Sequence, residues 1–346
     1  MIARMKRSNL VAACGAILSS TSFVGAQLPT PTTPKNLPKV TIKHLKGKSR
    51  IEIDGKLFTE YVYEGWANPI LYPVHGAHGV AMTRNFPMKK GVKAEAADHK
   101  HHRSLWFTHG EINGHDFWAG KGRIVQAKTS ASQGDNVVII ISRNDYMVDD
   151  KRICRDKRTI AFHAQPEGRF IDYEIILQAS DGDVVFGDTK EGSMAMRVTP
   201  SLRLKGKAAK GHIRNSEGVK DKKAWGKRAK WVDYYGPVEG KTVGVAIFDH
   251  PDNYGHPCRW HARDYGLVAA NPWGIHHFER APKRTGEMKL KAGRAMRLRY
   301  RFYFHAGTTE DAKVAAQYEK FAILGPVQEP KVKKQASGKD RPRKNR

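Results

Sequence analysis

Cysteine is scarce in this sequence, with three residues among 346, and this excludes a small fold held together by disulfides. Cys14 falls within an N-terminal leader, so Cys154 and Cys258 remain for the folded part of the chain. A disulfide between them is allowed in an oxidising compartment, but two buried free thiols are the simpler prediction. Stability must come from a hydrophobic core, and the length suffices for one large core or two modest ones.

The familiar local signatures of catalytic sites are also missing. The sequence has no HExxH, no CxxC, no zinc-finger spacing of Cys and His, no GxSxG and no glycine-rich phosphate loop. Any metal site would have to assemble from distant loops. A divalent metal therefore stays open as a cofactor, and no particular metal is indicated.

Acidic residues are few, 34 against 61 Lys and Arg, and the formal net charge is +27. The excess is concentrated in three segments: residues 1–26, residues 200–231 with 11 basic and 2 acidic residues, and residues 331–346 with 8 basic and 1 acidic. These segments hold 19 of the 27 charges. A solvated loop, or attachment to anionic envelope polymers, explains such local charge as well as nucleic-acid binding does.

The leader has the three parts of a secretory signal peptide. Arg4, Lys6 and Arg7 precede an apolar run over 10–18, and small residues follow up to Ala26. We expect cleavage near Ala26 and a periplasmic or extracellular protein. Lipoprotein processing at Cys14 is the less favoured alternative, because only four apolar residues precede that cysteine. An exported protein is not expected to have a nucleic-acid partner. After the leader, no stretch of the sequence has the roughly 20 apolar residues of a membrane helix.

Composition divides the rest of the chain. Residues 27–39 contain four prolines and are expected to form an extended linker. A single domain is expected over 40–323, interrupted by an exposed basic insertion at 203–230. The basic tail, 324–346, has almost nothing to bury and is expected to be disordered.

Hydrophobic residues alternate with polar ones over short runs, the period of a half-buried strand. The runs lie at 50–54, 58–63, 123–128, 136–142, 157–164, 169–178, 194–198, 241–248 and 296–305. They predict an all-β fold of antiparallel sheets packed face to face. One C-terminal helix is expected over 310–322, capped by Thr309, with Val314, Tyr318 and Phe321 on one face.

Histidines gather in two segments, with seven of the 16 in 75–115 and five in 250–277. In the segment 98–118, an extended chain would place His99, His101 and Arg103 on one side and Asp98 and His102 on the other. Imidazole can give or take a proton near neutral pH, and it binds transition metals. The alternative is that these histidines bond to buried backbone groups and stack on neighbouring tryptophans.

The second segment, 249–274, interleaves Arg, Trp, His and Asn on loops stiffened by three prolines. Flat rings suit the apolar faces of sugars, and fork-shaped donors suit hydroxyls and carboxylates. The segment therefore indicates a sugar site, or alternatively an aromatic-rich turn region at the end of a sandwich.

Four stretches, 78–84, 98–118, 191–197 and 248–251, resemble the bacterial secreted family labelled "methane oxygenase PmoA", and the resemblance covers about residues 40–323. It implies an antiparallel β-supersandwich of the galactose-mutarotase-like kind, and a carbohydrate site. The catalytic residues it implies are His102, Glu191, His99, His101, His109 and Asp116. The substrate-binding residues it implies are Arg103, Asn113, Trp118, Asp249, His250, Arg259, Trp260 and His261.

Within that resemblance, His102 and Glu191 are the nominal acid and base, and Arg103 or Arg259 would neutralise a uronate carboxylate. The favoured function is a secreted carbohydrate-active enzyme of the epimerase, lyase or hydrolase type, with a carbohydrate or anionic polysaccharide as its partner. A non-catalytic glycan-binding or envelope protein is the first alternative. A metal-dependent oxygenase, as the family label suggests, is the second.

Overall fold

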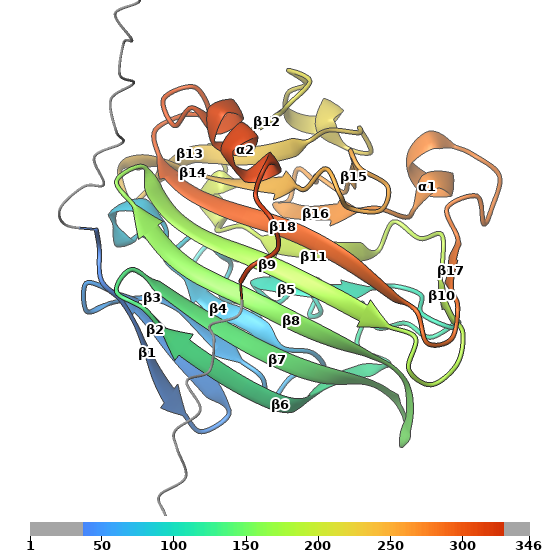
Figure 1. Cartoon of the computed structure of the whole chain (residues 1–346). Coiled ribbons are helices and arrows are strands. Elements are labelled where there is room, and N and C mark those ends of the chain that lie inside the picture. The colour runs from blue at the N-terminus through green and yellow to red at the C-terminus, as the bar shows by residue number, and fades with distance from the viewer. Residues whose placement is uncertain (1–36, 329–346) are drawn as a thin grey trace, which may run out of the picture. The chain divides into compact units, whose positions relative to one another are not determined.

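The computed structural model describes residues 37–328, and within this range two large antiparallel sheets form the fold (Figure 1). Across the first sheet the strands are β1 (Val40–Leu45), β2 (Lys48–Ile53), β3 (Lys56–Val62), β4 (Ile70–Val74), β5 (Leu105–His109), β11 (Gly192–Arg197), β16 (Leu267–Asn271) and β15 (Arg259–Trp260). Across the second they are β12 (His212–Asn215), β13 (Trp231–Val238), β14 (Lys241–Asp249), β18 (Ala295–Ala306), β9 (Gly168–Gln178), β8 (Lys151–Gln165), β7 (Val137–Val148) and β6 (Arg123–Gln133). A further pair joins β10 (Val184–Phe186) and β17 (Met288–Leu290).

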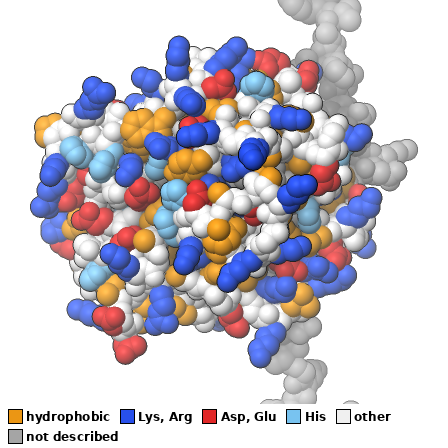
Figure 2. Space-filling model, turned by 180° about the vertical axis from the view of Figure 1, so that it is seen from behind, with side chains coloured by type: hydrophobic (Ala, Val, Ile, Leu, Met, Phe, Trp, Pro, Cys, Tyr) orange, Lys and Arg blue, Asp and Glu red, His pale blue; other side chains and the backbone are white. Residues whose placement is uncertain are grey.

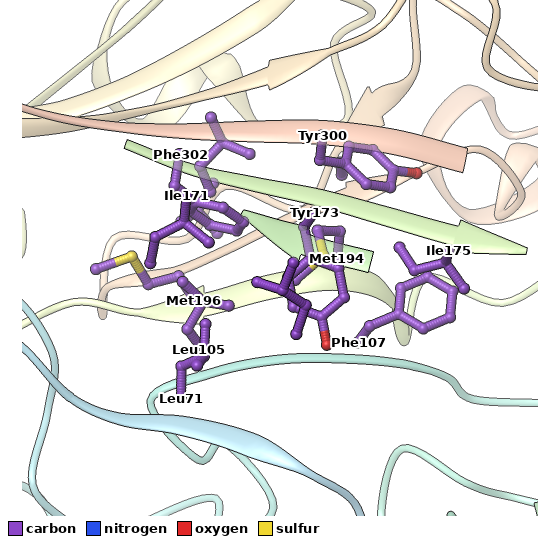
Figure 3. Packing of buried hydrophobic residues seen from close by; sticks show 14 of the residues in the cluster. Leu71, Leu105, Phe107, Ile171, Tyr173, Ile175, Met194, Met196, Tyr300 and Phe302 are labelled. Atoms are coloured by element: carbon purple, nitrogen blue, oxygen red, sulfur yellow. The ribbon is translucent and has the colours of Figure 1, made fainter. Parts of the chain in front are cut away.

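The two large sheets pack face to face around one hydrophobic core (Figure 3). Met194 and Met196 of β11 point inward from the first sheet, and Ile171 and Ile175 of β9 meet them from the second. Within each strand these residues are separated by an even number of positions, two on β11 and four on β9, as residues on one face of a pleated strand must be. The expected all-β class of antiparallel sheets is therefore confirmed.

A charged pair lies inside this core, and both of its side chains are fully buried. Asp156 accepts hydrogen bonds from Arg158 Nε (2.9 Å) and from Tyr146 Oη (2.8 Å). Asn144 Nδ2 donates to the other carboxylate oxygen of Asp156 (2.5 Å), and Arg158 Nη1 donates to Tyr173 Oη (3.2 Å). The ion pair is stabilised by this network, because an unpaired buried charge would be very unfavourable.

Helix α2 (Val314–Ala322) covers the outer face of the second sheet, where Tyr318 contacts Phe248 at a ring distance of 5.7 Å. The helix begins later than the sequence predicts, and Thr309 is not its cap. The Thr309 hydroxyl instead donates to the buried carboxylate of Asp233 (2.6 Å). A second short helix, α1 (Ile275–Glu279), was not expected, because five residues are too few to show a helical period.

No helix in residues 37–328 is both long enough and apolar enough to cross a membrane.

The described residues also contain three single-turn 3₁₀ helices, η1 (Ala77–Gly79), η2 (Pro200–Leu202) and η3 (Asp221–Ala224).

The basic segment 203–230 differs from the exposed insertion that we expected. It supplies the edge strand β12, which pairs with β13, and its apolar residues Ile213 and Ala224 are buried. Its lysines lie on the outside, so the segment is polar in composition although it belongs to the sheet.

Cys154 and Cys258 are both free and buried, in agreement with the simpler prediction. The predicted signal peptide, 1–26, lies outside the described residues, as do most of the linker, 27–39, and most of the tail, 324–346. The start of that tail is in contact with the domain, because the Leu324 carbonyl accepts hydrogen bonds from Arg299 and His250.

Candidate functional site

A cavity of about 690 Å³ opens beside β5, β11 and β16, on the face of the first sheet that points away from the core. Its size is that of a typical small-molecule site. Figure 2 shows the chain from this side, with histidine and apolar side chains between charged ones near the middle. The residues that line this histidine cavity are His99, His101, His102, Gly110, Glu111, Gly114, Asp116, Trp118, Ala119, Thr189, Lys190, Glu191, His261, Arg263 and Tyr265.

Two buried arginines hold the loop that carries the first three histidines. Arg84 donates to Asp98 (2.5 Å) and to the carbonyls of His99 (3.0 Å) and His102 (3.2 Å). Arg197, on β11, donates to the same oxygen of Asp98 (3.2 Å). Burial alone would raise the pKa of Asp98, but Arg197, His99 and Arg84 hold it below its usual value. Two cations thus share one nearby carboxylate, which leaves excess positive charge behind the cavity.

The tautomer of His102, which lines this cavity, is fixed by a neighbouring arginine. Arg197 Nη1 donates to His102 Nδ1 (3.0 Å), and because guanidinium only donates, Nδ1 must carry the lone pair and Nε2 the proton. Burial and the charge of Arg197 hold the pKa of His102 well below 6.5, so the ring is neutral at pH 7. His102 Nε2 is buried and has no partner among the described residues.

His261 has the opposite tautomer. Its Nδ1 lies 2.9 Å from the Lys190 carbonyl, which only accepts, so Nδ1 carries the proton and Nε2 the lone pair. Burial lowers the pKa of His261 to about 4, although the neighbouring Glu191 acts in the other direction. Burial would raise the pKa of Glu191, but its hydrogen bond from Lys190 (2.9 Å) and the nearby His261 hold it below its usual value. Among its four histidines and three carboxylates, the cavity therefore includes two neutral imidazoles with opposite tautomers, His102 and His261, and the ionised Glu191.

The histidine loop is not extended, which corrects our assignment of its two sides. Ala94, His99 and Ser104 all have left-handed backbone, with φ of 67°, 44° and 60°. Such conformations are uncommon in residues other than glycine and cluster at functional sites. As a result His99 stacks on His102, with ring centres 4.8 Å apart and planes 13° apart, and His101 meets His102 edge-on at 4.5 Å.

Aromatic side chains form the apolar part of the cavity wall. Trp118 packs on Trp106 at a ring distance of 5.2 Å, and Tyr265 stacks on His99 at 5.1 Å. The indole nitrogens of Trp106 and Trp118 are buried without a partner in the described part of the chain. Buried donors are usually satisfied, so three unpartnered donors close together, these two and His102 Nε2, are unusual.

The histidines are not arranged around a common point. Among residues 37–328, no group of three or more His, Cys, Asp or Glu side chains is placed to hold a metal ion. Ring-nitrogen lone pairs lie in the plane of the imidazole, so the stacked rings of His99 and His102 do not direct them to one ion. Arg197 also occupies Nδ1 of His102. The side chains therefore do not fit the divalent metal that the sequence left open.

Three predicted residues of the first segment lie outside the cavity. His109 points to the other side of β5, where it bonds to the Gly187 carbonyl (2.8 Å) and packs on Trp273. Arg103 donates to Asn68 and lies over Trp66. The amide of Asn113 joins its loop to β10 through the Val185 NH (2.7 Å). By contrast, Asp116 lines the cavity, and one of its oxygens accepts the Ala119 NH (2.8 Å).

Of the five later residues predicted to bind substrate, only His261 lines the cavity. Asp249 is fully buried and accepts from His256, Asn253 and the Cys258 NH, so it organises its own loop. His250 bonds to Arg299 and Leu324 near α2. Arg259 pairs with Glu279 (2.6 Å), and Trp260 donates to the Ala229 carbonyl inside the core. These four residues stabilise loops and the core of the sandwich, and they do not line the cavity.

Sequence reasoning missed the residues that tie the site together: Arg84, Arg197, Lys190, Arg263 and Tyr265. Arg84 and Arg197 stand at the ends of two stretches that carry the family resemblance, which was the available signal. Nothing local distinguishes a buried arginine from an exposed one.

Fold and cavity together define an antiparallel β-sandwich protein with a histidine-lined polar site on the outside of one sheet. The chain belongs to the family described as "Family of unknown function (DUF6807)", whose model matches residues 48–319. That description names no oxygenase, so the methane oxygenase label of the resemblance is not confirmed. No curated protein matches the chain in sequence.

Among solved structures, the chain is similar to a galactose mutarotase-like protein from Lactobacillus casei ATCC 334, with TM-score 0.37 and 9% identity, over 77% of this chain and 100% of that one. It is similar to a mutant of heparan sulfate lyase HepC from Pedobacter heparinus, with TM-score 0.38 and 9% identity, over 80% and 38%. It is also similar to a putative aldose 1-epimerase from Escherichia coli K12, with TM-score 0.32 and 8% identity, over 78% and 100%. Such distant likenesses assign no substrate or reaction to this chain.

Proposed function

We propose that this protein is a carbohydrate-active enzyme that moves a proton on a sugar bound in the histidine cavity. The observation that carries the proposal is the pair of neutral imidazoles with opposite tautomers, His102 as donor and His261 as acceptor, in one cavity. Acid–base catalysis needs both functions within reach of the substrate. Arg197 fixes the tautomer of His102, and the Lys190 carbonyl fixes that of His261. Neither ring can therefore easily change from donor to acceptor or the reverse.

In the proposed mechanism, His261 Nε2 accepts a proton from a sugar hydroxyl or C–H group. The ionised Glu191 lies close enough to stabilise the imidazolium that forms. His102 Nε2–H donates a hydrogen bond to the oxygen that gains negative charge, and Arg197 strengthens that donor from the other side of the ring. Trp118 and Tyr265 line the cavity, so the sugar would lie beside these two aromatic side chains.

This arrangement favours an epimerase or lyase over a hydrolase. A typical glycoside hydrolase uses two carboxyl groups, one of them protonated as the acid. Glu191 is kept ionised by Lys190 and His261, so it is unsuited to that role. The test is an assay of the purified protein on free aldoses and on neutral and acidic polysaccharides, following anomer exchange by NMR and unsaturated products by ultraviolet absorbance. Binding without turnover on the whole panel would favour the glycan-binding alternative.

The pH dependence of the reaction follows from His261. As a base it must be neutral, so activity is present above its pKa and lost as the pH falls through about 4. We expect the acid limb of kcat/KM near pH 4, well below the 6.5 of an ordinary histidine. A limb between pH 6 and 7, within about half a unit of an unperturbed imidazole, would contradict this assignment.

We also propose that the protein acts outside the cytoplasm, as the predicted signal peptide indicates. The exported protein is then expected to begin near Gln27. N-terminal sequencing tests this, and an intact Met1 or a lipidated Cys14 would show that the leader is processed differently.

A further inference from the structure

Shallow depressions continue from the histidine cavity toward the edge strand β12. Arg263, in the cavity wall, also lines a groove of about 160 Å³ with Lys222 and Trp225, the Lys222 groove. Lys222 in turn lines a hollow of about 540 Å³ with Lys220 and Lys223, the basic hollow. Each depression shares a residue with the next, so the three lie next to one another on this face, and together they are called the path.

The path ends at lysines whose positive charge is only partly balanced, with Asp264 beside the Lys222 groove and Asp221 in the basic hollow. Lys220, Lys222 and Lys223 are all exposed. Lys222 has a loose ion pair with Asp264 (3.8 Å), while Lys220 and Lys223 have no ion pair among the described residues. Figure 2 shows Lys and Arg side chains spread over this face and along its upper rim, where β12 lies in Figure 1. The path therefore presents exposed positive charges to the part of a ligand that extends outside the cavity.

The inner end of the path carries both signs of charge, because Glu111, Asp116 and Glu191 line the histidine cavity together with Lys190. Arg84 and Arg197 share the carboxylate of Asp98, and Arg263 lies in the wall. On its other side, the histidine cavity shares Glu111 and Gly114 with a further cavity of about 500 Å³. A ligand in the histidine cavity can thus extend in both directions.

We infer that the substrate is an acidic polysaccharide, bearing carboxylate or sulfate groups, that lies along this path with one internal unit in the histidine cavity. The inference rests on the proposed function and specifies its substrate class. A linear polyanion matches the row of depressions and the exposed lysines at its outer end, whereas a free monosaccharide would leave these lysines without a role.

The test compares two triple variants of the mature protein with equal changes in net charge. The path variant is Lys220→Gln, Lys222→Gln and Lys223→Gln. The control variant is Lys46→Gln, Lys56→Gln and Lys151→Gln, which are exposed lysines outside these depressions. Binding is measured to polygalacturonate, to a sulfated galactan, to neutral amylose and to double-stranded DNA, each at two salt concentrations.

We expect wild type to bind one of the two acidic polysaccharides, and the comparison between carboxylated and sulfated polymers identifies the group. The path variant should bind that polymer roughly tenfold more weakly than the control variant, with a shallower salt dependence. Binding of the matching acidic disaccharide should be equal in both variants, because the cavity is unchanged.

Equal polymer affinity in the two variants, no binding of either acidic polymer, or DNA binding as tight as polysaccharide binding would each overturn the inference. If the wild-type protein still turns over a disaccharide or a free sugar under any of these outcomes, the proposed function stands and only the substrate class is wrong. If the wild-type protein turns over neither, the proposed function itself is contradicted.

Discussion

Replacing His261 by asparagine is expected to lower turnover by about 10²- to 10⁴-fold, the usual contribution of a general base. The amide nitrogen of asparagine can take the position of Nδ1 and keep the hydrogen bond to the Lys190 carbonyl. The substitution therefore removes the Nε2 lone pair with little change in local structure. The measurement is kcat on the best substrate of the panel, together with Kd and melting temperature.

His102→Asn is the matching change on the donor side. The asparagine oxygen can accept from Arg197 in place of Nδ1, while the Nε2–H is lost. A fall in kcat of about 10²- to 10³-fold is expected, as for removal of one donor to a developing oxyanion. The control is His115→Asn, an exposed histidine of the same segment that does not line the cavity. Turnover that stays near wild type in both cavity variants would contradict the mechanism.

Replacing Asp156 by alanine is expected to lower the free energy of unfolding by about 3–5 kcal/mol. The change leaves the guanidinium of Arg158 buried between the sheets without its carboxylate, and it removes the acceptor of Tyr146 and Asn144. Chemical denaturation of the purified variant measures the loss, which is a large part of the stability of a typical domain.

Asp181→Ala provides the comparison for this prediction. Asp181 pairs with Arg152 at the surface (2.9 Å), with both side chains partly exposed. Exposed pairs contribute about 0–1 kcal/mol, so this variant should unfold close to wild type. If the two variants lose similar amounts of unfolding free energy, the buried network contributes no more to stability than the surface ion pair does.

The fold could be predicted from the sequence because its signal is local. Strand β7 alternates buried and more exposed residues along most of its length, and that period of two indicates a sheet with one buried face. Short elements gave no such signal: α1 has five residues, and β12 is polar because it lies at the edge of the sheet.

The candidate site was predicted in part. Enrichment in histidine drew attention to 98–118, and His99, His101, His102, Asp116 and Trp118 do line one cavity. Enrichment alone could not separate His102 from His109, which occupies the core side of β5. The direction in which each histidine of this loop points depends on the left-handed backbone at His99 and Ser104. Nothing in the sequence indicates that these two residues adopt that conformation.

The buried arginines show the other limit of sequence reasoning. Charged residues are rarely buried, so Arg84 and Arg197 would be placed at the surface by default. Their burial depends on Asp98, which is 99 residues from Arg197 in the chain, and on backbone carbonyls of the histidine loop. Such a long-range pairing is visible only once the sheet order is known.

The central claim, that His102 and His261 have opposite tautomers in one sugar site, can be measured directly by ¹⁵N NMR of the histidine side chains, assigned with the two asparagine variants. At pH 7 we expect a proton on Nε2 of His102 and on Nδ1 of His261, with both signals shifting when the best-bound oligosaccharide is added. A shared tautomer, a protonated His261 at pH 7, or signals that do not respond to any glycan of the panel would contradict it.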